Sequence, residues 1–302
     1  MRNALQTRSL LKNRLRADLL LLGAALVWGS NFAGQRVAAA HLGFFLYNGF
    51  RFLLGAVTVA PVLGKRWRDI TSLEIRGGLL AGALLLVASA LQQAGLAFTT
   101  AGKAGFVTGL YVVMVPLFLA LVWRQWPRWP VWPASFLATA GLILLSSDAR
   151  VLLSFGDGLQ LAGAVLWALH VILIGRLARR VNTLRLALIQ YLVCGLLSTV
   201  LGLAGEFHTL DGLSTVWWAV VYGGVISVGL GYTLQVLGQE DAPASDAAII
   251  LSMEAVFAAL FGWLLLGETL TAPQILGCGL MLAGMLLAQA SASLHPTPGS
   301  PG

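Results

Sequence analysis

The chain has 302 residues, of which 58% are hydrophobic and only 10% are charged, and its formal net charge at pH 7 is +7. Soluble domains carry about 25% charged residues, so this composition excludes an ordinary water-soluble protein. Its apolar runs extend for about 20 residues without alternation of polar and apolar side chains, which also excludes a membrane β-barrel. We therefore expect an all-α integral membrane protein in contact with a lipid bilayer.

The apolar runs predict ten transmembrane helices joined by short polar connections. In chain order, the expected spans cover residues 19–39, 42–63, 77–98, 101–123, 129–147, 159–178, 183–205, 215–238, 244–266 and 272–290. These spans form a first five-helix repeat, 18–147, and a second, 159–290, separated by a linker at 148–158. We expect residues 1–17 to form a cytoplasmic tail and the Pro/Gly/Ser-rich residues 291–302 to form a disordered tail.

Lys and Arg cluster in alternate connections. The N-terminal segment holds five, the second-to-third connection four, the fourth-to-fifth two and the sixth-to-seventh four, which is fifteen of the 19 basic residues. The positive-inside rule then places both termini of this multi-pass protein in the cytoplasm, and we expect it in the cell inner membrane. Since the basic residues act as topology signals, no nucleic-acid partner is expected.

An internal repeat relates the two halves. When residues 88–145 are shifted by 143 positions they align with 231–288 without a gap, with 14 identities in 58 positions. Gln92 then matches Gln235 and Gly141 matches Gly284, while a shorter similarity relates the first and sixth spans. Because each half has five spans, the second half enters the membrane from the opposite side. Inverted repeats with a site near the bilayer midplane are typical of secondary transporters.

Glu254 lies within the apolar run "AAIILSMEAVFAALFGWLLLG" of the ninth span. An ionisable residue near mid-bilayer is costly, which favours a functional role. We interpret it as a protonatable coupling group that faces a central cavity. The alternative is a structural carboxyl group that is protonated or hydrogen-bonded to a neighbouring helix. The repeat places Tyr111, a neutral residue, at the equivalent position of the first half.

The other candidate site residues are polar or aromatic side chains in the interior of matching spans. The expected substrate-binding residues are Asn31, Gln92, Tyr111, Trp167, His170 and Gln235. Each also has an alternative as a structural residue that bonds or packs within the bundle. For Arg51 we favour a structural role, in which it bonds carbonyl groups at a helix end. For the matching pair Lys103 and Asp246 we favour capping or snorkelling over a gating charge pair.

Enzyme motifs are absent from the sequence. It contains no Gly-rich phosphate loop, no HExxH motif and no paired carboxylates within one span, so we expect no enzyme activity, no cofactor and no metal. The expected partners are a small-molecule substrate and the bilayer, with the protein acting as a monomer or homodimer. Two alternatives from other classes are a membrane-embedded enzyme that modifies lipids and a structural membrane subunit that does not transport.

Five stretches in order resemble the EamA-type branch of the drug/metabolite transporter superfamily: "ALVWGSNFAGQR", "YNGFRF", "TTAGKAGFVTGLYVVMVPLF", "DGLQLAGAVLWALHVILIGRLA" and "ASDAAIILSMEAVFAALFGWLLLGETLTAPQILGCGLMLAGMLL". The resemblance covers about residues 18–290. It implies two inverted five-helix halves, a central substrate cavity and secondary transport, commonly export of amino acids or other small metabolites. The chain departs from the family at Ala255, where proline is frequent, and at Gln125, which matches the acidic Glu268 of the second half.

Overall fold

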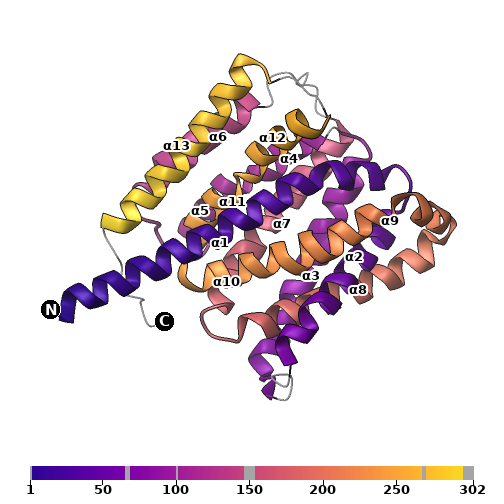
Figure 1. The fold of residues 1–302 in the computed structure, drawn as a ribbon, viewed down its shortest axis with the longest axis horizontal. Helices are drawn as coiled ribbons and strands as arrows, with labels where there is room; N and C mark the ends of the chain where they lie inside the picture. The colour runs from indigo at the N-terminus through magenta and orange to yellow at the C-terminus, as the bar shows by residue number, and fades with distance from the viewer. Residues whose placement is uncertain (1, 65–68, 100, 146–153, 267–269, 295–302) are drawn as a thin grey trace.

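The computed structural model describes residues 2–64, 69–99, 101–145, 154–266 and 270–294. Within these ranges every regular element is helical (Figure 1). The first half contains α1 (Arg2–Ala39), α2 (Phe44–Leu63), α3 (Ser72–Leu96), α4 (Ala101–Gly109), α5 (Tyr111–Leu121) and α6 (Val131–Leu145). The second half contains α7 (Phe155–Leu177), α8 (Thr183–Gly205), η2 (Phe207–Gly212), α9 (Leu213–Val221), η3 (Tyr222–Tyr232), α10 (Thr233–Asp241), α11 (Ala244–Leu251), α12 (Glu254–Leu266) and α13 (Ala272–Leu294).

Ten helical segments correspond to the ten expected spans. In the described part of the chain, nine stretches are long and apolar enough to cross a membrane, and α6 is a shorter apolar helix of 15 residues. The fourth span combines α4 with α5, the eighth runs from η2 to α10, and the ninth combines α11 with α12. The prediction of an all-α membrane protein with ten spans is therefore confirmed.

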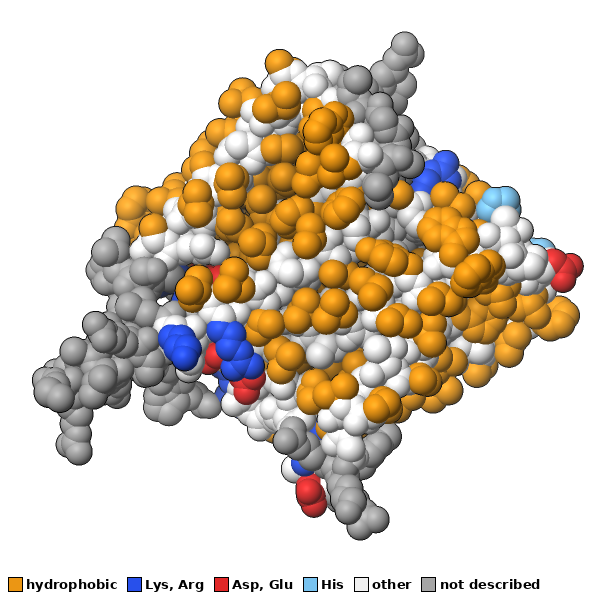
Figure 2. All heavy atoms as spheres, in the orientation of Figure 1, with side chains coloured by type: hydrophobic (Ala, Val, Ile, Leu, Met, Phe, Trp, Pro, Cys, Tyr) orange, Lys and Arg blue, Asp and Glu red, His pale blue; other side chains and the backbone are white. Residues whose placement is uncertain are grey.

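Apolar side chains cover the broad outer face of the bundle. Figure 2 shows them spread across the middle of this face, with charged side chains near its margins. Large residues such as Val57, Phe136 and Val200 are more than 60% exposed on the outside of their helices. A soluble monomer rarely exposes so much contiguous apolar surface, so this face suits contact with lipid chains.

Two helix boundaries differ from the sequence expectation. Helix α1 begins at Arg2, so most of the expected tail 1–17 continues the helix of the first span. This segment is rich in Leu, Arg and Ala and contains no Pro or Gly before Gly23, so nothing in it stops the helix. Helix α7 begins at Phe155, inside the expected linker, because Ser154 and Asp157 form a capping box at its first turn.

The N-terminal half of α1 and the fourth-to-fifth connection meet at one carboxylate. Asp246, at the start of α11, accepts hydrogen bonds from the guanidinium groups of Arg14 and Arg128, each at 2.6 Å. Asp246 is only 1% exposed, so it forms a buried ion-pair cluster and does not snorkel. It does lie in the first turn of α11, where a carboxylate complements the helix dipole as the sequence predicted. The side chain of Lys103, its counterpart in the repeat, lies outside the described residues.

The other basic connections join the same end of the bundle. The Arg176 guanidinium lies 4.5 Å from the ring centre of Trp123, which links the sixth-to-seventh and fourth-to-fifth connections. Arg185 pairs with Glu74 at 3.2 Å and so links the sixth-to-seventh connection to the start of α3. The described parts of the four basic segments therefore lie at one end, as the charge pattern predicts.

The fifth and tenth spans pack against each other through small residues. Helices α6 and α13 lie side by side at one edge of the bundle (Figure 1). A Cβ atom added at Gly141 would lie 2.5 Å from the carbonyl oxygen of Gly277, and one at Gly284 would lie 2.7 Å from that of Ala134. Since Gly141 and Gly284 are equivalent in the repeat, the close approach is itself symmetric.

The fourth and ninth spans are interrupted at equivalent positions. Helix α4 ends at Gly109 and α11 is followed by Ser252, and these two residues are 143 positions apart. Glycine is a poor helix former, and the Ser252 hydroxyl bonds back to the carbonyl oxygen of Ile249 at 2.8 Å. After the interruption, the second helical segment begins at Tyr111 in the fourth span and at Glu254 in the ninth.

Candidate functional site

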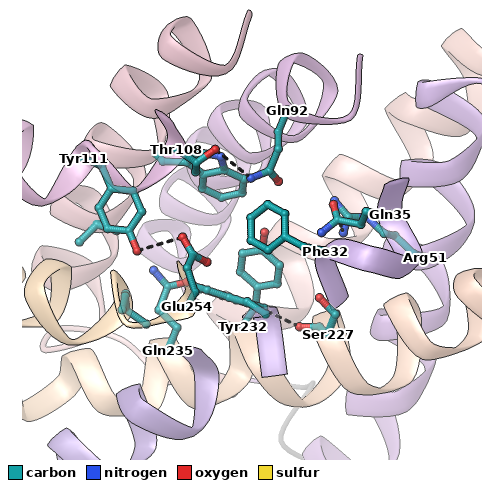
Figure 3. A pocket seen from close by; sticks show the side chains of 14 residues that line it. Phe32, Gln35, Arg51, Gln92, Thr108, Tyr111, Ser227, Tyr232, Gln235 and Glu254 are labelled. Atoms are coloured by element: carbon teal, nitrogen blue, oxygen red, sulfur yellow. Dashed lines mark hydrogen bonds between the residues drawn. The ribbon is translucent and has the colours of Figure 1, made fainter. Parts of the chain in front are cut away.

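A cavity opens between the two halves near the helix interruptions (Figure 3). It includes about 450 Å³ of space free of protein atoms, part of which is open at the mouth. Its lining comes from spans one to four of the first half and spans six, eight and nine of the second. The lining residues are Trp28, Phe32, Gln35, Arg51, Gln92, Thr108, Tyr111, Trp167, Val171, Ser227, Tyr232, Gln235, Leu251 and Glu254.

Ten of these fourteen residues form five pairs from matching spans of the two halves. Three pairs follow the repeat at its shift of 143. The other two lie in the first and sixth spans 139 positions apart, one position from the shift of 140 that aligns Gly23 with Gly163. The pairs are Gln92 with Gln235, Thr108 with Leu251, Tyr111 with Glu254, Trp28 with Trp167, and Phe32 with Val171. The cavity therefore lies where the matching helices of the two halves face each other.

Tyr111 and Glu254 meet inside this cavity. The Tyr111 hydroxyl donates a hydrogen bond to Glu254 Oε1 at 3.4 Å, across 143 residues of sequence (Figure 3). Tyr111 is 3% exposed and Glu254 is 4% exposed, so neither is wetted from the outer surface. No ion pair with Glu254 occurs among the residues that the structure describes. A neutral hydroxyl is thus the carboxyl group's hydrogen-bonding partner there.

Helix α1 passes close to the backbone of Glu254. A Cβ atom added at Gly29 would lie 2.6 Å from the carbonyl oxygen of Glu254 and 2.8 Å from the backbone nitrogen of Ala258. Only a glycine allows the first span to approach the start of α12 at this distance. The position of Glu254 in the cavity wall is therefore fixed by a helix of the opposite half.

An amide network supports the first-half wall. Gln92 donates to the hydroxyl of Thr108 at 3.4 Å, and Thr108 donates to Gln160 Oε1 at 3.1 Å. Gln160 in turn donates to the backbone oxygen of Gln92 at 2.8 Å, which closes the ring of contacts. These neutral bonds join α3, α4 and α7, so Gln92 and Thr108 are held at the cavity by a helix of the second half.

Aromatic rings form the opposite wall. The rings of Trp28 and Tyr232 lie 4.6 Å apart, and Trp167 stacks on Tyr232 at 5.9 Å with an interplanar angle of 25°. The Trp28 indole also donates to the backbone oxygen of Ser227 at 3.2 Å. Ser227 and Tyr232 belong to η3, a stretch of π-helix, and such stretches are frequent at functional sites.

The structure places five of the seven sequence-predicted site residues around the cavity: Gln92, Tyr111, Trp167, Gln235 and Glu254. His170 and Asn31 are fully buried and do not line it. His170 instead contacts the Gln190 side chain at 2.9 Å, between α7 and α8. Helix geometry explains this result, because Trp167 and Val171, four residues apart, share the cavity face while His170 lies about 100° away from Val171.

Sequence reasoning did not single out Phe32, Thr108, Val171, Ser227 or Leu251 as site residues, although all of them line the cavity. Matching spans contained a signal for four of them. Phe32 pairs with Val171 and Thr108 with Leu251, and each pair lies one helical turn from a pair that contains a predicted residue. Ser227 had no comparable signal, because it is brought to the wall by the π-helical stretch.

Three lining side chains have polar atoms without a hydrogen-bond partner among the described residues. They are the Gln235 carbonyl oxygen, the Trp167 indole nitrogen and Arg51 Nη2. Buried polar groups are rarely left unsatisfied in proteins, so each exception calls for an explanation such as a water or ion bound to it. The wall thus offers one acceptor and two donors to a solute in the cavity.

Comparison with known proteins identifies relatives that are named as transporters. An uncharacterized transporter of Archaeoglobus fulgidus is 31% identical over 276 residues, covering 91% of this chain and 86% of the relative. The uncharacterized transporter YoaV of Bacillus subtilis is 20% identical and covers 88% of this chain and 94% of the relative. The threonine/homoserine exporter RhtA of Escherichia coli is 29% identical over 150 residues, 48% of each chain.

A solved crystal structure has the same fold. It superposes with a TM-score of 0.75 at 20% sequence identity, over 91% of this chain and 97% of the other. The pattern of the EamA-like transporter family matches residues 15–147 and again residues 154–289, one match for each five-helix half. With both halves matched and its relatives named as transporters, this chain belongs to the EamA-like transporter family.

Proposed function

We propose that the protein is a secondary transporter that exports a small organic solute by alternating access. The two halves frame one cavity through equivalent residues, so a rocking motion of one half against the other can expose it first to one side and then to the other. The solute would occupy the space between the aromatic wall and the amide network. Charge placement favours cytoplasmic termini and a location in the inner membrane.

Amino acids or related metabolites are the proposed solutes. The similarity to a protein named as a threonine/homoserine exporter supports this class, although it spans about half of each chain. The unsatisfied donors and acceptor of the wall also suit a compact polar solute more than a lipid chain. We therefore propose that the cavity binds a polar molecule of amino-acid size.

Glu254 is the proposed coupling group. Its carboxyl group lies in the cavity, bonded to Tyr111 and without an ion pair among the described residues. Intramembrane carboxyl groups that face a cavity serve as proton relays in pumps and transporters. In this proposal, Glu254 binds a proton in one state of the cycle and releases it in the other, which couples proton movement to solute movement.

The single observation that carries the proposal is the contact between Tyr111 and Glu254, which joins the two halves inside the cavity. The Glu254→Gln variant tests it in proteoliposomes loaded with an amino-acid mixture. The amide nearly matches the carboxyl group in size, so folding should be near normal. Gradient-driven efflux should be lost, while counterflow without a gradient should continue.

Two results would contradict the proposal. If the Gln variant keeps full gradient-driven transport, Glu254 does not couple a proton. If the wild-type protein moves no solute of the mixture in either assay, the proposed transport of amino acids is refuted. An Arg179→Gln variant, altered at an exposed residue distant from the cavity lining, serves as the matched control.

A further inference from the structure

Arg51 is a buried cation that the cavity does not neutralise. It lies on α2, is 1% exposed, and lines the cavity. Its Nε donates to the Asn48 side-chain oxygen at 2.9 Å, and its Nη1 donates to the Gln35 side-chain oxygen at 3.4 Å. Side-chain amides therefore hold the guanidinium, and not the helix-end carbonyl groups that the sequence suggested.

Neutral groups also flank the guanidinium. The ring centres of Tyr47 and Phe52 lie 5.1 Å and 5.0 Å from its central carbon. No carboxylate forms an ion pair with Arg51 in the described part of the chain. Amides and rings fix the direction of the planar group but leave its full positive charge in place, which is strongly unfavourable in a buried site unless an anion joins it.

One nitrogen of Arg51 remains available to such an anion. Nη2 is buried and has no hydrogen-bond partner among the described residues. Figure 3 shows Arg51 and Gln35 at one end of the cavity and the Tyr111–Glu254 pair at the other, with Phe32 between them. The cavity thus carries a cation at one end and a carboxyl group at the other.

We propose that Arg51 is the subsite for a carboxylate of the transported solute, which makes the solute a compact molecule with a carboxylate at one end. A guanidinium matches the geometry of a carboxylate or a phosphate, and the proposed amino-acid solutes carry a carboxylate. At the far end, Glu254 then receives a hydrogen-bond donor of the same solute, such as an ammonium group. This inference rests on the proposed function and narrows it.

The test uses matched compounds on the purified full-length protein in detergent. Thermal stabilisation is titrated with L-threonine, L-leucine and L-phenylalanine, with their amides, and with the three amines that lack the carboxyl group. The acids that bind should bind about tenfold or more tightly than their amides and amines, because the analogues leave Arg51 unpaired. Equal binding of an acid and its amide overturns the proposal, as does failure of every acid to bind.

Variants sharpen the assignment to one side chain. Arg51→Gln should abolish the preference for the acid over its amide, and Arg51→Lys should keep a reduced preference because the charge remains without the planar fork. Arg179→Gln should leave the preference unchanged. If an Arg51 variant does not fold, the comparison of acids and amides on the wild-type protein still decides the proposal.

Failure of this inference can be told apart from failure of the proposed function. Gradient-driven flux of an amino acid that Arg51→Gln does not alter would leave transport standing and refute the carboxylate subsite. Binding of acids that depends on Arg51, with no flux of any of them in proteoliposomes, would support the subsite and refute transport.

Discussion

The two halves of the molecule build the cavity largely from matching helices but give its walls different chemistry. Where both halves carry the same residue, as with Gln92 and Gln235, the cavity wall is symmetric. Where they differ, as with Tyr111 and Glu254, one half supplies a carboxyl group and the other a neutral hydroxyl. Packing is thus shared between the halves, while the charged groups are not.

The third and eighth spans show the same difference in backbone geometry. Helix α3 is one uninterrupted α-helix of 25 residues, whereas its counterpart, Phe207–Asp241, contains the π-helical stretch η3. Only the second half therefore brings residues such as Tyr232 to the wall by a change of helix type. The comparison teaches that the repeat explains the position of the cavity, and that departures from the repeat explain its chemistry.

Disruption of the packing between α6 and α13, made equally from either half, should have the largest effect on the protein. Gly141→Leu and Gly284→Leu each force a side chain into the backbone of the facing helix, so each should lower the free energy of unfolding by about 3 kcal/mol. Gly279→Leu, at a glycine with nothing within 4 Å, should change stability little. Thermal unfolding of the purified variants measures all three, and a large difference between Gly141 and Gly284 would show that the packing is not shared.

Exchange of Tyr111 and Glu254, the pair that differs between the halves, should have the next largest effect, which is on transport. In the double variant Tyr111→Glu, Glu254→Tyr, the carboxyl group moves to the first half, next to Thr108 instead of Leu251. Because its surroundings change, we expect gradient-driven flux to fall about tenfold or more, with near-normal expression. Flux in proteoliposomes measures this effect. Full activity of the exchanged protein would mean that the halves are chemically equivalent after all.

The smallest effect should come from the ion-pair cluster at the basic end. Asp246→Asn removes the charge that holds Arg14 and Arg128, so this end should open more often. A cysteine at Gln235, in a protein without Cys194 and Cys278, should then react about threefold to fivefold faster with a water-soluble thiol reagent applied from that end.

The control for this measurement is Asp69→Asn. The Asp69 side chain is 81% exposed, and its distance of 3.9 Å from Arg185 is long for an ion pair. Its charge should therefore contribute little to closure of the basic end. If the Asp246 variant reacts no faster than this control, the cluster does not hold the basic end closed.

The sequence predicted the spans and the repeat, because these depend on apolar length and on matching positions, and five of its seven candidate site residues line the cavity. It could not distinguish His170 from Trp167, since a helix that is apolar on all sides gives no periodic signal for the face that meets the cavity. Arg51 was assigned a structural role for a related reason. Its side-chain partner Gln35 lies on another helix, and the sequence does not show which helices meet.

Covalent linkage of the two halves has a consequence at the contact of Tyr111 with Glu254. Two identical chains related by a two-fold axis must place the same side chain on both sides of that axis. Two glutamates would bring like charges together in a buried space, and two tyrosines would supply no carboxyl group. A single chain that contains both halves escapes this restriction, so one position can hold the acid while its counterpart holds the hydroxyl that bonds to it.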